Sequence, residues 1–393
     1  MNINKIQKLI KFIYAKKIVP VHEPVITDLD KKYVNDCVKS TFVSTVGKYV
    51  NLFENEIKRI TNSKYVIAVN SGTSALHLAL TAINVNKNHE ILLPSATYVS
   101  TANAVIYCGA DPHFVDISYK TIGVDPFKLE NYLKKNTYIK NKKCINKKTK
   151  KIIKALIVVH AYGHPADLDN LKKVCLKFKL DLVEDAAEAL GSFYKNKHTG
   201  TFGKVGILSF NGNKTITTGG GGVLLTNNSI LSKKMRRLST LAKISHPWEQ
   251  KFDMLGYNYR MINISAALGC SQIKQLNKIL GKKRKITKFY QKMFLFEKNI
   301  NFFQEPEYCK SNYWHQLVIV NESQKKVKRY LKQFHKNKIL TKAMWTPLHK
   351  LKYLLKYPRM NLSNTEKLYK SVIILPSGAG IIENRLDKVI SKK

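Results

Sequence analysis

The pattern of apolar and polar positions predicts an alternation of strands and helices through about the first two-thirds of the chain. Short apolar runs of strand type lie at 64–69, 89–94, 154–161, 181–185 and 205–210. Segments with the apolar spacing of helices lie between these runs, for example 74–83 and 166–179. Short apolar runs that alternate with helices are typical of a mostly parallel sheet covered on both faces. The pattern therefore predicts an α/β domain.

The pattern changes after about residue 260. One long helix is predicted over 264–295, and shorter mixed segments such as NYWHQLVIV (312–320) follow it. This shift predicts a second, smaller α+β domain. We expect three parts: an N-terminal helix and arm (1–30), a large domain (31–255) and a small C-terminal domain (256–393).

The N-terminal segment MNINKIQKLIKFIYAKK has apolar residues at helical spacing, interrupted by lysines. It lacks the continuous apolar core of a signal peptide, and the chain has no apolar run near the ~18–20 residues that span a bilayer. An amphipathic helix here either docks on the body of the protein or lies on a membrane surface. We expect no stable membrane insertion.

The net charge of +42 suggests a polyanionic partner such as nucleic acid. The excess is nearly all lysine, whereas phosphate clamps and base-reading sites favour arginine. Enrichment in Lys, Asn and Ile also follows from an AT-rich genome. The densest lysine run, 134–154, reads as a solvated loop with a strand behind it. We therefore expect no nucleic-acid partner.

Six cysteines lie at wide and irregular spacings, without a C-x-x-C pair. This spacing argues against a zinc site and against a disulfide framework. It fits a reducing compartment, so we expect a cytoplasmic protein.

The segment NSGTSALHLAL (70–80) follows a predicted strand and opens a helix. Gly72 permits close backbone approach, and Thr73 and Ser74 bring hydroxyls and free N–H groups to the helix N-terminus. Such an end suits a phosphate group. The segment matches neither common nucleotide-binding glycine motif. Ser/Thr capping alone is the other interpretation.

Two further segments place reactive groups at strand ends. Asp185 ends DLVED, where open α/β sheets bind ligands, although it could also cap a helix. Lys214 follows the next strand and precedes four glycines, 219–222. Pyridoxal 5′-phosphate chemistry uses this set: a lysine that holds the cofactor as a Schiff base, an aspartate at the ring nitrogen and a helix N-terminus for the phosphate. The glycines would leave space for the backbone beside a bulky cofactor.

The chain resembles the DegT/StrS family of PLP-dependent nucleotide-sugar aminotransferases over nearly its whole length, about 19–377. The motifs that carry the resemblance are NSGTSAL, PSATYVSTANAV, VVHAYGHPADLD, VEDAAEALGS, GTFGKVGILSFNGNKTITTGGGG and GYNYRMINISAALG. STFVSTVGKYV (40–50), Glu188 and SFNGNK are most similar to the LegC-like branch. The resemblance implies PLP-dependent transferase fold type I, which is aspartate aminotransferase-like.

For the cofactor ring, the resemblance implies Lys214 as the catalytic residue that bonds to the cofactor and moves protons. Asp185 would pair with the pyridinium nitrogen, and Tyr98 would cover the ring or simply pack. Glu188 stands near the 3′ hydroxyl, where the family more often has Gln.

For the phosphate, the resemblance implies Thr73, Ser74 and Ser209, beside Gly72. Asn258, in GYNYR, would reach the phosphate of a neighbouring subunit. A homodimer with shared active sites is therefore expected.

Two segments depart from the family pattern. HAYGH (160–164) places His164 where an amide is commoner, and the i, i+4 pair with His160 follows a strand, so we expect no metal site. AMWTPLHK (343–350) resembles the substrate segment without its Arg-Pro. Trp345 and His349 would either line the substrate site or pack in the core.

The function implied is transfer of an amino group from an amino-acid donor, glutamate, to C4 of a nucleotide-linked 4-keto-6-deoxy-N-acetylhexosamine for surface-glycan synthesis. UDP and GDP are both left open. A sugar dehydratase of the same family is an alternative, but it needs His in place of Lys214. A non-catalytic regulatory or polyanion-binding protein is the other alternative.

Overall fold

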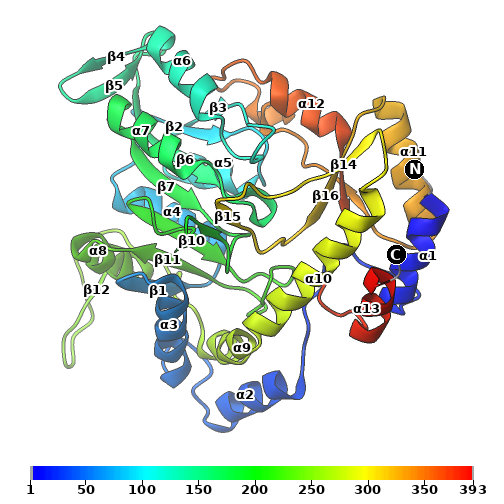
Figure 1. Ribbon diagram of the computed structural model, residues 1–393. Helices are drawn as coiled ribbons and strands as arrows, with labels where there is room; N and C mark the ends of the chain where they lie inside the picture. The colour runs from blue at the N-terminus through cyan, green and yellow to red at the C-terminus, as the bar shows by residue number, and fades with distance from the viewer. Residues whose placement is uncertain (1–2, 392–393) are drawn as a thin grey trace.

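The computed structural model describes residues 3–391, in which a wide sheet covered by helices stands beside a smaller unit (Figure 1). The first two residues of the predicted N-terminal arm and the last two of the predicted C-terminal domain lie outside the described residues. Helices α1 (Ile3–Tyr14) and α13 (Glu383–Ser391) lie near each other at the smaller unit. The predicted domain limits themselves stay a prediction.

The central sheet is mostly parallel, as the alternation of strands and helices predicts. Its strand order is β1-β11-β10-β7-β6-β2-β3, and the hairpin β4–β5 extends it beside β6. Strand β11 runs antiparallel to β1 and β10, while β10, β7, β6, β2 and β3 are parallel neighbours. The strands are β1 (Tyr65–Val69), β2 (His89–Pro94), β3 (Asp111–Val115), β4 (Thr137–Lys140), β5 (Lys143–Asn146), β6 (Ile152–Val159), β7 (Asp181–Asp185), β10 (Val205–Ser209) and β11 (Gly222–Thr226).

The parallel strands are continuous apolar runs because both sheet faces are buried. In β2, Ile91 packs into the core on one face with Leu76, whereas Leu92 packs on the other face with Leu171. The helices around this sheet are α2 (Asp28–Lys39), α3 (Lys48–Thr61), α4 (Gly72–Ala82), α5 (Ser100–Tyr107), α6 (Pro126–Asn136), α7 (Leu168–Phe178), α8 (Ser229–Ser239) and α9 (Asn263–Lys274).

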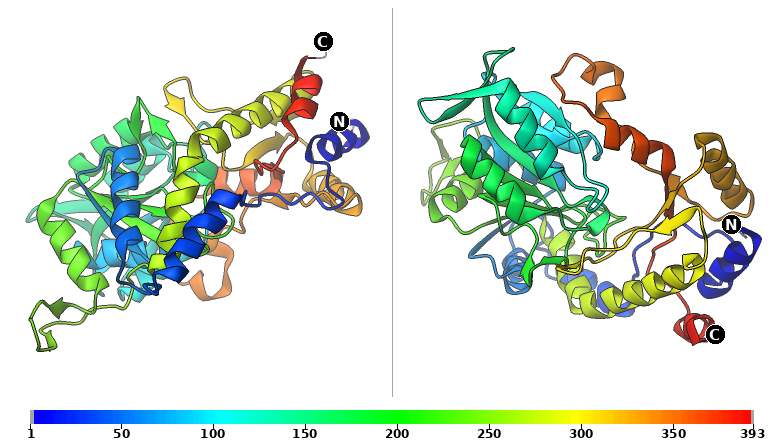
Figure 2. Two further views of the ribbon diagram at one scale, coloured as in Figure 1. Left: turned by 90° about the horizontal axis from the view of Figure 1, so that it is seen from below. Right: turned by 45° about the horizontal axis from the view of Figure 1, so that its top comes forward.

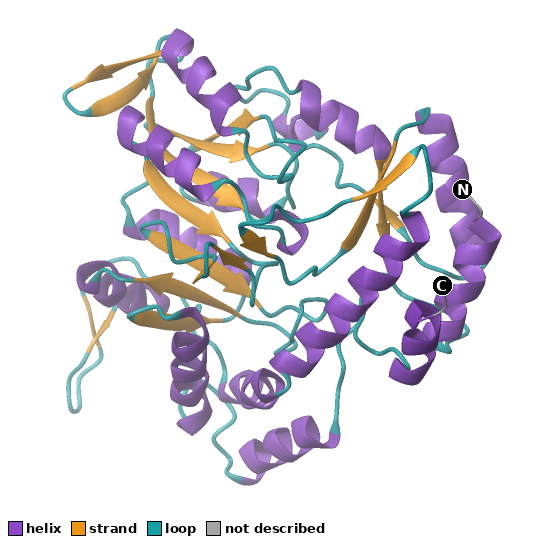
Figure 3. Ribbon diagram, in the orientation of Figure 1, coloured by secondary structure: helices purple, strands orange, loops and turns teal. Residues whose placement is uncertain are grey.

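The lysine-rich segment 134–154 is a hairpin, and the prediction of a loop before a strand is wrong in this respect. Strands β4 and β5 pair with each other, and β5 also pairs with β6 (Figure 3). Cys144 is buried in the core, while Tyr138 and Ile139 on the partner strand are exposed. Lysines occupy so many positions of this segment that β4 and β5 show no clear alternation of apolar and polar residues in the sequence.

The long helix predicted over 264–295 is divided at Gln275 into α9 and α10 (Leu276–Phe294). Helix α9 packs beside α3, where Ala266 and Phe53 share one core cluster. The side chain of Gln275 donates to both carboxylate oxygens of Asp30, each at 3.2 Å, which anchors the break. Helix α10 then runs from the large sheet to the smaller unit (Figure 2).

The smaller unit contains an antiparallel sheet of order β14-β16-β18-β17, which fits the predicted α+β domain. Its strands and helices are β14 (Ile300–Phe302), β16 (Gln316–Val320), β17 (Lys342–Ala343), β18 (Val372–Leu375), α11 (Gln324–Lys336) and α12 (Ser363–Ser371). Short 3-10 turns lie at Ala161–Gly163, Leu348–Lys350 and Lys352–Leu354.

Helix α1 docks on the smaller unit, which decides between the two interpretations of the N-terminal segment. Ile6 and Ile10 are buried in one cluster with Phe334 of α11 and Leu386 of α13. The apolar face that a membrane surface would need is therefore covered by protein. Within residues 3–391, no helix is long and apolar enough to cross a bilayer.

Two groups of short strands complete the fold. Strands β8 (Phe193–Tyr194), β9 (Lys197–His198) and β15 (Cys309–Lys310) form one small sheet. Strands β12 (Lys243–Ile244) and β13 (Lys251–Phe252) form a hairpin that projects from the body (Figure 2). Trp248 near its tip is 82% exposed.

Candidate active site

A cavity of about 450 Å³ lies between the ends of the central strands and the β14-β16-β18-β17 sheet of the smaller unit. It is lined from one side by β7 and β10, and from the other by β17 and β18. The predicted residues that line it are Gly72, Thr73, Tyr98, Asp185, Glu188, Ser209 and Lys214. The structure therefore brings most of the predicted set together. Ser74 and Asn258 lie outside the lining.

The N-terminus of α4 forms one end of this cavity. The hydroxyl oxygen of Ser71, the N-cap residue, accepts from the backbone N–H of Ser74 at 3.0 Å. A Cβ on Gly72 would come within 2.8 Å of the Ser209 Cβ, so only glycine lets this helix abut the end of β10. The N–H of Ser74 is used by the cap. Ser71 lines the cavity instead, which the preference of N-caps for serine could have indicated.

The Asp185 carboxylate lies at the cavity end of β7. One oxygen accepts from the Thr101 hydroxyl at 2.9 Å, and the other accepts from the N–H of Ala187 at 3.2 Å. Burial raises the pKa of Asp185, and these hydrogen bonds oppose the rise. Among the described residues no cation pairs with this carboxylate. It is therefore available to a cationic group in the cavity, and the sequence carried no signal for its partner Thr101.

Glu184, the neighbour of Asp185, faces away from the cavity. Its carboxylate accepts from His160 Nε2 at 3.0 Å, from the N–H of Gly200 at 2.7 Å and from two further backbone N–H groups. Burial alone would raise the pKa of Glu184, but the hydrogen bonds hold it below its usual value. Successive strand residues point to opposite faces, so only one of the two acids reaches the cavity.

Lys214 reaches into the cavity from the loop after β10. Its Nζ lies 3.4 Å from Oε1 of Glu188 and 4.2 Å from the centroid of the Trp314 ring. The indole N–H of Trp314 donates to the carbonyl of Asn213 at 2.7 Å, which fixes the ring against this loop. Burial raises the pKa of Glu188 to about 7, although Lys214 opposes the rise.

The glycines at 219–222 occupy their positions for different geometric reasons. A Cβ on Gly222 would lie 2.5 Å from the carbonyl oxygen of Ser71, so the start of β11 needs glycine for close approach to α4. Gly219 has a φ of +78°, which glycine adopts at low cost. Gly220 and Gly221 line the cavity.

The opposite wall comes from the smaller unit and contains Trp314, His315, Lys342 and Trp345. The Trp345 ring stacks on Tyr162, with centroids 4.1 Å apart and planes at 11°. Among these residues, only Trp345 lies in a segment that resembles the family's substrate segment. The others lie in segments without a motif, so no sequence signal indicates that they face the cavity.

Two histidines weighed from the sequence lie outside the cavity lining. The His349 ring bonds to the Ser95 hydroxyl at 2.7 Å and to Glu366 at 2.8 Å. His164 is buried between Phe303 and Tyr313, and burial lowers its pKa to about 3. These contacts give both residues a packing role.

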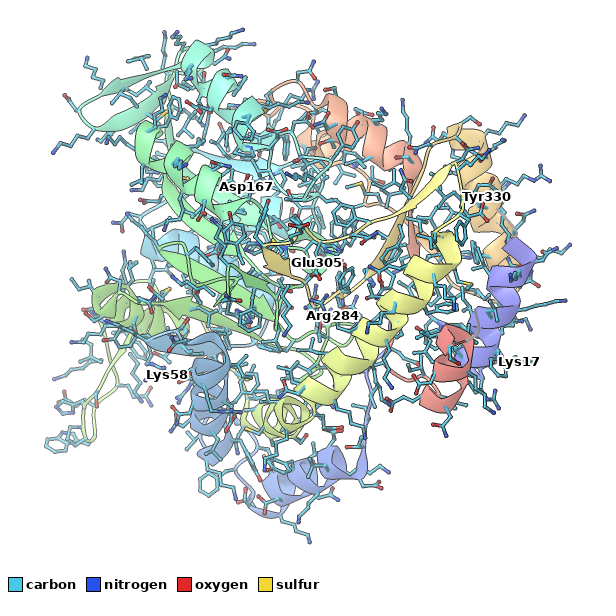
Figure 4. All side chains as sticks on the ribbon, viewed as in Figure 1. Lys17, Lys58, Asp167, Arg284, Glu305 and Tyr330 are labelled. Atoms are coloured by element: carbon cyan, nitrogen blue, oxygen red, sulfur yellow. The ribbon has the colours of Figure 1, made fainter. Side chains whose placement is uncertain are left out.

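The segment that carries Trp314 is held by an ion pair near the centre of the molecule (Figure 4). Arg284 of α10 bonds to both carboxylate oxygens of Glu305, with Nη2 and Oε2 3.1 Å apart. The Arg284 guanidinium also lies 5.1 Å from the centroid of the Tyr313 ring. The wall is therefore braced against a long helix.

These groups fit pyridoxal phosphate. The amine of Lys214 lies in the cavity, an unpaired buried carboxylate belongs to Asp185, and hydroxyls surround a helix N-terminus at one end. A cationic ring nitrogen suits such a carboxylate, and a phosphate suits such a helix end.

Comparison with known proteins agrees with this fit. The chain is 33% identical over 378 residues to the GDP-perosamine synthase of Vibrio cholerae, covering 95% of this chain and 97% of that protein. It is 35% identical over 262 residues to the UDP-4-amino-4,6-dideoxy-N-acetyl-beta-L-altrosamine transaminase of Campylobacter jejuni, covering 66% of this chain and 65% of that protein.

A solved structure shares the fold over nearly the whole chain. It is that of Helicobacter pylori PseC, an aminotransferase involved in the biosynthesis of pseudoaminic acid. The TM-score is 0.84 at 26% identity, covering 95% of this chain and 97% of PseC. The model of the DegT/DnrJ/EryC1/StrS aminotransferase family matches residues 24–392. The chain belongs to this family and is a pyridoxal-phosphate-dependent sugar aminotransferase.

Proposed function

We propose that the chain transfers the amino group of glutamate to C4 of a nucleotide-linked 4-keto-6-deoxy-N-acetylhexosamine. The observation that carries the proposal is the position of the Lys214 amine inside a cavity that also presents the Asp185 carboxylate and the start of α4. The names of the Vibrio and Campylobacter relatives support a nucleotide-linked amino sugar as the product. The N-acetyl group is expected from the LegC-like motifs, and the Campylobacter name supports it.

Pyridoxal phosphate, when bound, supplies a ring that takes up the electron pair left when a proton leaves the carbon beside the amino group. Lys214 would hold the cofactor covalently at rest. Asp185 would keep the ring nitrogen protonated, with Thr101 orienting its carboxylate. Tyr98 would cover the ring, and Glu188 would lie beside its hydroxyl.

The phosphate would lie at the N-terminus of α4. Gly72, Thr73 and Ser209 line this end of the cavity. Ser74 would act through the cap that it forms with Ser71, because its N–H and its hydroxyl both bond to the Ser71 side chain.

Lys214 would move the protons in both halves of the reaction. Once released, its Nζ takes the proton from Cα of the donor, and in the second half it delivers a proton to C4 of the sugar. Two neighbouring groups hold the amine at this place, because Nζ lies 3.4 Å from Oε1 of Glu188 and 4.2 Å from the centroid of the Trp314 ring.

We also propose a homodimer with shared sites, in which Asn258 reaches the partner's phosphate. Asn258 is exposed and lies outside the lining of its own cavity. Trp248 of the neighbouring β12–β13 hairpin and Leu255 after it are exposed. Mixing an inactive Lys214→Ala protein with an inactive Asn258→Ala protein should restore activity only if sites are shared between subunits. No recovery in a mixed dimer would contradict the shared site.

The proposed reaction is tested with purified protein in two steps. Amino acids are first added singly, and loss of the cofactor's Schiff-base absorbance identifies the donor, with glutamate expected. UDP- and GDP-linked 4-keto-6-deoxy sugars, with either an acetamido group or a hydroxyl at C2, are then added and the products analysed by mass and NMR. Amination at C4 of an acetamido sugar is expected. Exclusive use of the C2-hydroxyl sugars would overturn the substrate proposal.

A further inference from the structure

The cavity wall contributed by the smaller unit is basic. Lys342 and His315 line it, and no carboxylate among the described lining residues comes from this side. Lys283 and His22 lie behind it. We refer to these four residues as the basic wall.

Lys342 is the unpaired cation of this wall. It lies on β17, where its backbone pairs with Ile374, and its side chain is exposed. Among the described residues it has neither an ion-pair partner nor a side-chain hydrogen bond. A cation that lines a cavity and has no protein partner is available to an anionic ligand.

His315 presents one free ring nitrogen beside Lys342. Its Nδ1 lies 3.1 Å from the hydroxyl oxygen of Ser377. The single proton of that hydroxyl has its nearest acceptor in the carbonyl of Trp314, at 2.8 Å, so Nδ1 of His315 is the donor to Ser377. Nε2 has no hydrogen-bond partner among the described residues and can take up a proton when an anion arrives.

Lys283 and His22 add buried groups that lack a compensating charge. Lys283 is fully buried and donates to the carbonyls of Trp314 at 3.1 Å and Ser377 at 2.9 Å. Burial lowers its pKa to about 7. Both ring nitrogens of His22 are closed off from solvent without a partner among the described residues, and its ring lies 6.1 Å from that of His315. Buried polar groups of this kind are costly unless something offsets them.

The charges around His315 come from several elements. Burial lowers its pKa well below the usual value, and Lys283, Lys214 and Lys342 lower it further. The ring is therefore neutral in the absence of a ligand. A carboxylate placed against it would offset these cations and favour the protonated ring.

We propose that the basic wall binds the α-carboxylate of the amino donor, with Lys342 and His315 as its direct ligands. The inference rests on the proposed aminotransfer and assigns the part of the cavity that recognises the donor. Lys283 and His22 are positioning residues that lie behind these two ligands, with Lys283 holding the backbone of Trp314 and Ser377 in place.

The position of His315 and Lys214 near one ring favours the carboxylate over the diphosphate of the sugar substrate. Both groups lie close to the Trp314 ring, because Lys214 Nζ is 4.2 Å from its centroid and the His315 ring centroid is 3.8 Å from it. The carboxylate of an amino acid is bonded to the same carbon as the reacting nitrogen. The diphosphate of a nucleotide sugar is separated from C4 by the breadth of the hexose ring.

The test measures donor and nucleotide binding separately on the loaded enzyme. Glutamate is titrated without sugar and followed by absorbance, while 2-oxoglutarate, UDP and GDP are titrated by calorimetry. Lys342→Met should weaken glutamate and 2-oxoglutarate at least about tenfold and leave both nucleotides within about twofold. The matched control is Lys336→Met, which replaces an exposed lysine of α11 outside the cavity lining. This substitution should change neither the binding of glutamate and 2-oxoglutarate nor the binding of the nucleotides.

A ligand without the α-carboxylate tests whether this group is what the basic wall binds. Isoglutamine carries an amide in place of the α-carboxylate, so the wild type should prefer glutamate, and Lys342→Met should lose most of that preference. Unchanged discrimination, or weaker nucleotide binding instead, would overturn the subsite. A wild-type enzyme that no amino acid converts would overturn the proposed function together with it, whereas normal conversion by Lys342→Met would overturn the subsite alone.

Discussion

The two walls of the cavity are built in different ways. On the large-sheet side, Asp185 and Ser209 end neighbouring strands, and Gly72 begins the helix after another. Hydrogen bonds from backbone and hydroxyl groups fix the polar side chains there. The wall from the smaller unit is aromatic and basic, and its residues come from separate segments.

This difference separates two tasks. Groups at strand ends and helix starts have fixed positions, which suits bonding to a cofactor and moving protons at defined atoms. Aromatic rings and long cationic side chains are suited to holding substrates of different shape. We therefore expect substitutions on the large-sheet side to affect chemistry and folding most, and those on the other wall to affect binding.

The largest expected effect is on turnover at Lys214. Lys214→Ala removes the amine that bonds to the cofactor, and Lys214→Arg keeps the charge but not the nucleophile. Both should abolish turnover and the Schiff-base absorbance. Lys204→Ala, whose amine pairs with Asp181 outside the cavity, is the control and should keep both. A fully active Lys214→Ala protein would remove the chemical role assigned to this wall.

Glu184 should have the next largest effect, and it should affect stability. Glu184→Gln removes the charge that His160 and several backbone N–H groups share, so the free energy of unfolding should fall by about 3 kcal/mol. Because the pKa of Glu184 is held low, its stabilisation is present above the usual carboxyl pKa and is lost as pH falls through the lowered value.

Urea titrations at several pH values measure this effect. Glu56→Gln, which breaks only an exposed pair with Arg59, should cost under about 1 kcal/mol. Turnover per folded Glu184→Gln molecule should stay near that of the wild type, since Glu184 faces away from the cavity. Lost turnover in a fully folded variant would place Glu184 in the chemistry.

Glu188 should show the opposite pH dependence in cofactor-free protein. Its pKa is raised to about 7, so the charged form costs stability as pH rises from the usual carboxyl value through 7. Glu188→Gln should therefore be more stable than the wild type above pH 8, by up to about 3 kcal/mol, since each pKa unit is worth about 1.4 kcal/mol. The two proteins should unfold alike near pH 4. An advantage that does not change with pH would contradict the burial argument.

The sequence predicted the large-sheet side well because its signals are local. Asp185 closes an apolar run, and Gly72 stands where a strand gives way to a helix. The ends of neighbouring parallel strands meet at one edge of a sheet, so these positions could be placed together without coordinates. Thr101 lies in the motif PSATYVSTANAV, yet its bond to Asp185 depends on how α5 packs, which spacing does not specify.

The other wall depends on distances between segments that spacing does not encode. The segment 312–320 is one of the short segments expected after the long helix, but its pattern does not tell which cavity the Trp314 and His315 side chains would meet. Lys342 could not be singled out from the sequence, because a chain of net charge +42 has many lysines and none of them is marked by its neighbours as a cavity residue. The break at Gln275 escaped prediction for the same reason, since it follows from contact with the distant Asp30.

A substitution at Trp345 has the smallest expected effect. It tests whether the wall from the smaller unit recognises the sugar and the amino donor with separate residues. Trp345→Leu removes the ring that stacks on Tyr162, so unfolding should cost about 1 kcal/mol less, and the KM for the nucleotide sugar should rise several-fold. The glutamate half-reaction should be unchanged, because the donor subsite is assigned to Lys342 and His315. Tyr138→Leu, an exposed aromatic of the β4–β5 hairpin, is the control for general loss of a ring. Equal slowing of both half-reactions by Trp345→Leu would mean that the wall acts as one packed unit, and that sugar and donor are not recognised by separate parts of it.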